Sequence, residues 1–306
     1  MQPQLLERVA PEIGALAWGD PEAPLVIAVH GFPDTAWTWR HLGPELAGRG
    51  WRVVAPFTRG YAPSALAPGG GYDLGTLVAD IVAIRAALSP DRPVMLVGHD
   101  WGGAIVSAVA ASAPAGFGGA AILAIPPLPT ILDHLRRPRP AALARFLRQA
   151  PRSWYMALFQ VPGLAERVGH RLFGLLWRLW APGYDSTSDR ALLHASLPTT
   201  ARRAAAISYY RAVVNPAYRS SCHAGLRRAA FGPPRLPTLY LHGAADTCGR
   251  VELGLEAERH LPAGSRRVVV PGAGHFLHLE RPDAVNELIR TWLDRPDAVT
   301  REESPC

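Results

Sequence analysis

The stretch VMLVGHDWGGAIVSAVAA, residues 94–111, decides the fold. It starts as an apolar run, breaks at GHDWGG and continues with small and apolar residues. This order predicts a buried strand, a tight turn and a helix, with Gly98 and Gly102 bracketing the turn and Asp100 at its tip. Because an elbow of this kind usually presents a serine nucleophile, the carboxylate at its tip has to be explained by the chemistry.

Short apolar runs alternate with helical stretches on both sides of this elbow. Strands alternating with helices predict a mostly parallel sheet flanked by helices, an α/β fold. Helices are also expected at about 251–260 and at 281–293. The predicted strands are 24–30, 51–56, 93–98, 120–126, 236–243 and 266–272.

The middle of the chain breaks this alternation. From about residue 127 to 234 bulky residues recur at helical spacing and strand signals disappear, while PPLPT and FGPPRLP mark the two ends. We therefore predict a core formed by residues 1–126 and 235–306, and an inserted helical cap, or lid, formed by 127–234. Such an insert lies above the carboxyl ends of the strands, where open α/β sheets bind ligands.

Three candidate catalytic side chains each follow a predicted strand. They are Asp100, Asp246 in LHGAADTC and His275 in GAGHFLHLERP. Asp100 would also suit a helix N-cap, and Asp246 a turn. However, the order nucleophile, acid and histidine is that of the α/β-hydrolases, which the chain resembles from about residue 15 to 293, with GHDWGG as its nucleophile elbow.

The carboxylate at the elbow narrows the chemistry. It is a poor nucleophile toward esters, but it can displace a leaving group at saturated carbon and form an ester that water then cleaves. This reactivity suits epoxides and alkyl halides.

Further motifs resemble the epoxide hydrolase family. The resemblance implies that Tyr155 and Tyr210 are its two ring-opening tyrosines; Tyr209 and Tyr210 point about 100° apart on a helix, so only one can face the site. The motifs are HGFPDTAWTWR (30–40), TRGYAPS (58–64), WYMALFQVPGLAE (154–166) and SYYRAVV (208–214).

The same resemblance separates neighbouring candidates. The pair Gly274-His275 matches the family's histidine loop, whereas His278 is expected to pack against the following Arg-Pro turn. Asp34 is interpreted as a turn or capping residue, and Cys248 is given no role.

The resemblance implies a two-step hydrolysis without a cofactor or metal. Asp100 attacks an epoxide carbon while the two tyrosines protonate the ring oxygen. His275 then activates water, and Asp246 orients the imidazole. The N–H groups of Phe32 and Trp101 form the oxyanion hole. An apolar epoxide is the expected substrate, because the lid is rich in Trp, Phe and Leu.

Two alternatives stay open. A haloalkane dehalogenase shares the HDWG elbow, although its loop typically reads HGNP rather than HGFP. A non-catalytic hormone-receptor-like hydrolase fold is a different class, and the complete catalytic set argues against it.

The composition excludes other classes of protein. The 306 residues are 48% hydrophobic and 19% charged, so the chain is globular. The formal charge of +7 is carried by arginine without lysine, and we interpret it as a solvated basic face rather than a nucleic-acid site. No run approaches the ~20 apolar residues of a membrane span, and the first residues do not read as a signal peptide. We expect no membrane partner.

The cysteines indicate the compartment. Three scattered cysteines fit a reducing environment, so a cytoplasmic location is expected. Whether the chain forms a homodimer is left open.

Overall fold

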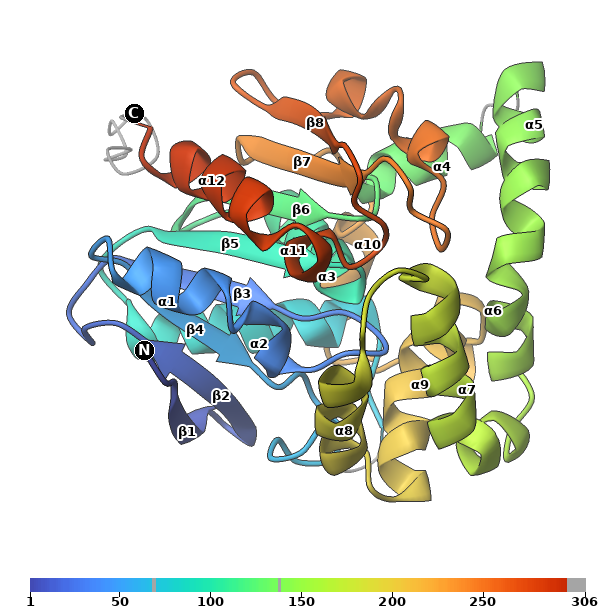
Figure 1. The fold of residues 1–306 in the computed structure, drawn as a ribbon, viewed down its shortest axis with the longest axis horizontal. Helices are drawn as coiled ribbons and strands as arrows, with labels where there is room; N and C mark the ends of the chain where they lie inside the picture. Colours follow the sequence, from blue (N-terminus) through green and yellow to red (C-terminus); the bar gives the residue numbers. More distant parts are fainter. Residues whose placement is uncertain (68–69, 137–138, 296–306) are drawn as a thin grey trace.

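The computed structural model, described for residues 1–67, 70–136 and 139–295, is built on one eight-stranded sheet (Figure 1). The strand order is β1-β2-β4-β3-β5-β6-β7-β8. The pairs β1–β2 and β2–β4 are antiparallel, and all the other pairs are parallel. The predicted fold class, a mostly parallel sheet flanked by helices, is confirmed.

The six predicted strands are present, and two more precede them. The extra pair, β1 and β2, is a hairpin that extends the antiparallel end of the sheet. The outer strand β1 is largely exposed, so its sequence lacks the continuous apolar run that marks the buried strands. The strands are β1 Gln4–Ala10, β2 Ile13–Trp18, β3 Leu25–Val29, β4 Arg52–Pro56, β5 Val94–His99, β6 Phe117–Leu123, β7 Thr238–Gly243 and β8 Arg266–Val270.

Helices cover both faces of the sheet (Figure 1). One face carries α1 (Leu42–Ala47), α11 (Leu277–Glu280) and α12 (Pro282–Leu293). The opposite face carries α2 (Leu74–Leu88) and α3 (Trp101–Ser112).

The prediction of a helix at 251–260 is wrong. Two short 3-10 helices, Val251–Gly254 and Ala257–His260, occupy this segment. Gly254 lies at the end of the first, and a Cβ added there would come within 2.2 Å of the Tyr240 hydroxyl. This close approach to β7 fits a broken segment better than a regular helix.

The chain between β6 and β7 is helical (Figure 1). Several polar contacts fasten it to the core. Among them, Arg40 forms an ion pair with Asp189 at 2.7 Å, and the Trp177 indole donates to the Pro33 carbonyl at 2.7 Å. The last helix, α10, packs against α2 and α3 on the core. The helices are α4 Leu128–Arg136, α5 Pro140–Gln149, α6 Trp154–Phe159, α7 Leu164–Trp180, α8 Thr187–Ser196, α9 Thr200–Val214 and α10 Ala224–Ala229.

Among the described residues, no helix combines the length and the apolar character needed to cross a bilayer.

Candidate active site

The elbow between β5 and α3 holds Asp100 in an unusual backbone conformation. Its φ of 50° and ψ of −118° are rare for a residue with a side chain, and such strain concentrates at functional sites. The glycines on either side are required sterically. A Cβ on Gly98 would lie 2.3 Å from the Gly102 carbonyl oxygen, and one on Gly102 would lie 2.0 Å from that of Val29. The turn therefore projects Asp100 from the carboxyl end of the sheet.

The buried carboxylate of Asp100 is held from one side by the loop after β3. The backbone N–H of Phe32 donates to Asp100 Oδ1 at 2.8 Å. The preceding Gly31 permits this approach, because a Cβ there would lie 2.5 Å from Asp100 Cβ. Trp101 is the first residue of α3, so its N–H has no partner within the helix and stands next to the same carboxylate.

His275 and Asp246 form the second part of the site. The loops after β8 and β7 bring His275 Nδ1 to 3.0 Å from Asp246 Oδ2. Asp246 Oδ1 accepts the N–H groups of Cys248 and Gly249, at 2.7 and 2.9 Å, and Oδ2 also lies 3.3 Å from His242 Nε2. Burial alone would raise the pKa of Asp246, but His275 and His242 outweigh it and hold that pKa far below 3.8. Asp246 is therefore ionised and can fix the imidazole orientation.

The other imidazole nitrogen faces the elbow. His275 Nε2 lies 3.7 Å from Asp100 Oδ2 and has no hydrogen-bond partner, although the ring is buried. Burial alone would lower the pKa of His275, yet Cys248 and the carboxylates of Asp246 and Asp100 raise it well above 6.5. The space beside Nε2 is where a group attacking the Asp100 carboxyl carbon would meet a base.

Two buried phenols reach the same place from the helices between β6 and β7. Tyr155 comes from α6 and Tyr210 from α9, and their ring centroids are 5.8 Å apart. The Tyr210 ring contacts those of Phe32 and Trp101, each at 5.1 Å, and its hydroxyl has no hydrogen-bond partner. Burial raises the pKa of both Tyr155 and Tyr210 well above 10, so both phenols stay protonated.

The neighbouring tyrosine is occupied elsewhere. The Tyr209 hydroxyl donates to the Arg59 carbonyl at 2.7 Å, and its ring stacks on Tyr72. Only Tyr210 of the pair therefore faces Asp100. Hydrogen bonds, close charged pairs and ring contacts connect all seven predicted site residues, and their catalytic roles remain predictions.

Behind His275 lies His278, whose surroundings differ from those expected from the sequence. The contacts of His278 are with residues far away in the sequence: Nε2 hydrogen-bonds Thr38 Oγ1 at 2.5 Å, and the ring lies against Trp39 and His99. Packing against the rings of Trp39 and His99 therefore determines the position of this side chain more than the local turn does. His99 Nε2 in turn contacts the His275 carbonyl oxygen at 2.9 Å and supports the histidine loop.

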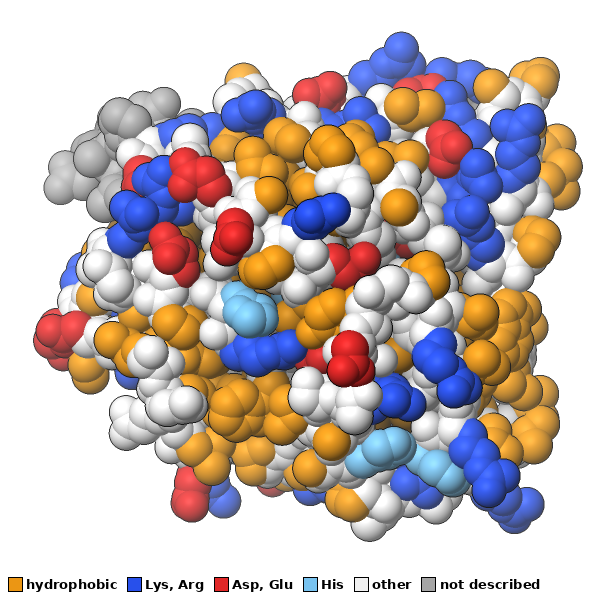
Figure 2. All heavy atoms as spheres, in the orientation of Figure 1, with side chains coloured by type: hydrophobic (Ala, Val, Ile, Leu, Met, Phe, Trp, Pro, Cys, Tyr) orange, Lys and Arg blue, Asp and Glu red, His pale blue; other side chains and the backbone are white. Residues whose placement is uncertain are grey.

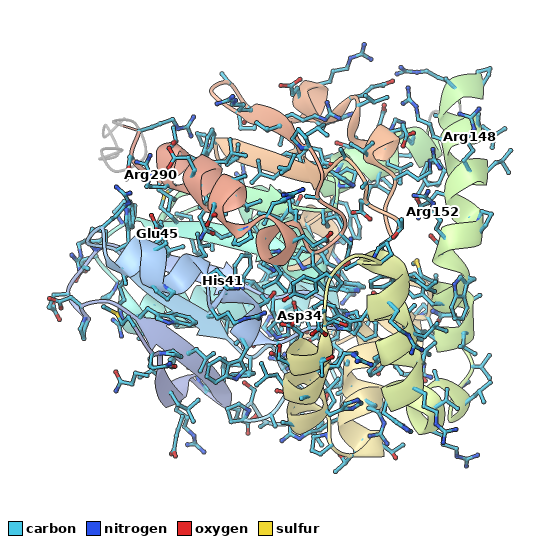
Figure 3. All side chains as sticks on the ribbon, viewed as in Figure 1. Asp34, His41, Glu45, Arg148, Arg152 and Arg290 are labelled. Atoms are coloured by element: carbon cyan, nitrogen blue, oxygen red, sulfur yellow. The ribbon has the colours of Figure 1, made fainter. Side chains whose placement is uncertain are left out.

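Asp34 completes this group in the interior (Figure 3). Its carboxylate accepts the Thr35 N–H at 2.7 Å, as a turn residue would, but the side chain is buried. One ligand atom each from Asp34, His99 and His278 lies within 4.8 Å of the others, a spacing that could admit a metal ion. Burial raises the pKa of Asp34 to about 8, so without a bound cation this carboxyl group is protonated at neutral pH.

Two residues that contact the tyrosines were not predicted from the sequence as part of the site. Cys248 Sγ lies 3.7 Å from the Tyr155 hydroxyl, and burial raises the pKa of this thiol. Trp180 packs edge-on against both Tyr155 and His275, at 5.0 and 5.1 Å. Cys248 stands two residues after Asp246, a signal that was visible in the sequence, whereas nothing in the sequence distinguishes Trp180 from other aromatic residues of α7.

Phe32 joins the two parts of the site. Its N–H holds Asp100, while its ring contacts Phe159, Phe173 and Tyr210 edge-on at 5.0 to 5.3 Å. The surroundings of the phenols and the carboxylate are therefore aromatic and apolar.

Comparisons with known proteins agree with this geometry. Residues 24–282 match the family profile of the alpha/beta hydrolase fold. The chain is 30% identical to epoxide hydrolase A of Mycobacterium tuberculosis, over 90% of this chain and 92% of that protein. It is 28% identical to epoxide hydrolase 3 of Xenopus tropicalis, over 94% and 76% of the two chains.

A solved structure shows the same fold. Potato epoxide hydrolase I superposes with a TM-score of 0.74 at 21% identity, over 95% of this chain and 99% of that one. The chain is a hydrolase that belongs to the epoxide hydrolase family of the α/β-hydrolase superfamily.

Proposed function

We propose that the protein adds water to an apolar epoxide to give a vicinal diol, through an ester formed on Asp100. The observation that carries this proposal is the position of two protonated phenols facing a buried carboxylate, with an unpartnered imidazole nitrogen 3.7 Å from that carboxylate. The names of the relatives agree with this reaction.

In the first step an Asp100 oxygen attacks one epoxide carbon. A carbon–oxygen bond forms, the ring C–O bond breaks, and the alkoxide takes a proton from Tyr155 or Tyr210. The backbone N–H of Phe32 keeps the carboxylate oriented for this attack.

In the second step water attacks the ester carbon of Asp100. His275 Nε2 removes the water proton, and the N–H groups of Phe32 and Trp101 stabilise the tetrahedral oxyanion. Ester formation removes the negative charge of Asp100, one of the charges that raise the pKa of His275. The imidazole therefore becomes easier to deprotonate when a base is needed. Collapse of the intermediate breaks the bond between the ester carbon and the alkyl oxygen, which takes the proton held by His275, so the diol is released. The remaining proton of the Asp100 carboxyl group passes to the tyrosinate, which restores the carboxylate and the phenol.

The tyrosine pair distinguishes this reaction from haloalkane dehalogenation. A halide leaves as a stable anion, whereas an alkoxide must be protonated. Two buried phenols with raised pKa values supply that proton and would be unnecessary for halide release.

The remaining expectations are kept as proposals. Residues 127–234 would form the lid, because they supply both phenols and the aromatic residues around them. The apolar character of the substrate follows from these aromatic neighbours. The cytoplasmic location stays a prediction, and the question of a homodimer stays open.

The test is turnover of a panel of apolar epoxides, with chiral analysis of the diols, beside matched alkyl chlorides and bromides. We expect diol formation without halide release, and loss of both in Asp100→Asn. Halide release without diol formation would favour the dehalogenase, and an inactive wild type would favour the non-catalytic alternative.

A further inference from the structure

The segment 134–184 carries most of the charge asymmetry of the chain. It contains nine arginines and a single acid, Glu166, so its net charge of +8 exceeds the +7 of the whole protein. Glu166 is buried and forms an ion pair with Arg211 at 2.5 Å. This acid therefore does not offset the arginines on the outer surface, of which Arg139 and Arg145 pair with Glu256 from outside the segment.

Helix α7 presents a mixed apolar and basic face to solvent. At about 100° per residue, seven exposed positions fall within an arc of about 120°. Four are apolar, with exposed fractions between 36% and 47%. The opposite side of the helix is buried and includes Phe173, Leu176 and Trp177. These seven positions, here named the arginine–leucine face, are Leu164, Arg167, Val168, Arg171, Leu175, Arg178 and Leu179; the other exposed position of the helix, His170, lies outside the arc.

The same character continues onto α5 and α6. Leu143 and Leu147, one helical turn apart, are 53% and 65% exposed, and Trp154 is 41% exposed. Arg148 lies on α5 near the margin of the molecule (Figure 3). In the space-filling view hydrophobic and basic side chains gather on the right-hand side, over α5 and α7 (Figure 2). Contiguous exposed apolar surface of this kind marks a binding site.

The arginines of the arginine–leucine face identify the kind of partner that it binds. Within the described part of the chain, Arg167, Arg171 and Arg178 have no ion pair or hydrogen bond to the protein. A two-fold dimer through this face would set arginines against arginines, because the same patch occurs on both copies. A surface that offers anions at its boundary and apolar chains beneath it matches both the arginines and the apolar side chains of this face.

We propose that the arginine–leucine face docks the protein on the surface of an anionic phospholipid bilayer. The apolar side chains enter the headgroup region and the arginines contact lipid phosphates. The expectation of no membrane partner rested on the lack of a spanning segment, and a surface contact needs no span. Docking is independent of the catalytic proposal, because none of these side chains belongs to the site.

The first experiment is co-sedimentation of the full chain with phosphatidylcholine vesicles, with and without phosphatidylglycerol. We expect binding only to the anionic vesicles, weakened by salt. In Arg171→Gln/Arg178→Gln affinity should fall about 25-fold, at about fivefold for each charge removed from an anionic surface. The matched control Arg8→Gln/Arg228→Gln removes two exposed arginines elsewhere and should change affinity less than twofold.

The second experiment tests the apolar component. Leu175→Ser/Leu179→Ser should weaken binding to anionic vesicles at high salt, where charge is screened, while Leu5→Ser/Leu66→Ser should not. Folding of each variant is checked by its thermal midpoint.

Three outcomes would overturn the proposal. They are failure of the wild type to bind anionic vesicles, equal binding by the face and control variants, and a dimer in light scattering that dissociates when the face is changed. Loss of vesicle binding in the face variants alone, with an oligomeric state that these variants leave unchanged, would support it.

Discussion

Replacing His275 with Gln should separate the two chemical steps. The proposed first step uses the Asp100 carboxylate, the Phe32 N–H and the two phenols, none of which hydrogen-bonds the His275 side chain. The variant should therefore still open the epoxide. The second step loses its base, because Nε2 is the basic atom beside the Asp100 carboxyl group.

The size of the effect follows from the role of that atom. Loss of a positioned general base slows a step by about 10²- to 10⁴-fold, so ester should accumulate to one per chain. The change also removes one partner of a buried ion pair, which costs about 3–5 kcal/mol where the remaining charge is uncompensated. The cost should fall below that range, because Asp246 keeps two backbone N–H donors and His242.

Intact-protein mass spectrometry after mixing with a substrate measures this directly. His275→Gln should gain one substrate mass, and peptide mapping should place it on GHDWGG. Asp100→Asn should gain nothing. A matched control is His278→Gln, which removes a buried histidine of the same loop that hydrogen-bonds Thr38; it should not trap the adduct.

The covalent mechanism would be refuted if His275→Gln released no diol and carried no adduct while remaining folded. A single turnover of the wild type in ¹⁸O-water provides an independent check. Label in the first diol, with none in Asp100, would show that water attacks the epoxide itself.

Other predictions concern the surrounding groups. Tyr155→Phe or Tyr210→Phe should slow ring opening by about 10²-fold and the double variant should nearly abolish it in single-turnover kinetics; wild-type turnover in the double variant would exclude both phenols. Ester hydrolysis should rise with pH through a midpoint above 6.5, because ionised Asp246 still favours the imidazolium of His275, and a stopped-flow rate that is flat from pH 5 to 9 would contradict this. Cys248→Ala removes the hydrogen-bond partner of the Tyr155 hydroxyl and should lower kcat more than it changes KM, whereas Cys248→Ser should restore part of the rate. The pKa of Asp34 rises from 3.8 in an exposed carboxyl to about 8 in the folded protein, so the folded state binds the extra proton and loses stability as the pH rises between those values. The thermal midpoint of Asp34→Asn should therefore increase relative to that of the wild type from pH 5 to pH 8. A constant difference between the two midpoints would contradict this.

The core and the elbow could be predicted because their signals are local. A buried parallel strand needs a continuous apolar run, and a turn as tight as the one at Asp100 needs Gly98 and Gly102. The strand ends then place Asp246 and His275 near the elbow by topology alone. The edge strand β1, with one side in water, gives no such run.

The environment of a side chain could not be predicted in the same way. His278 was assigned to its nearest turn, but a contact with Thr38, 240 positions away in sequence, decides where it packs. The position of Cys248 beside Tyr155 likewise depends on how α6 lies over the loop after β7. Such contacts join segments whose relative placement no local pattern records.

Phe32 contacts both Asp100 and the helices that lie over it, and it thereby couples substrate entry to the chemical step. Its ring is enclosed by side chains of α6, α7 and α9, and its amide holds the oxygen of Asp100. A substrate that displaces these helices on entering disturbs the ring, and through Cβ and Cα of the same residue it disturbs the amide that orients the nucleophile. A molecule that fits beneath the helices without strain keeps the carboxylate aligned, whereas an oversized one misaligns it. Discrimination by size would then be expressed in the rate of ester formation as well as in affinity.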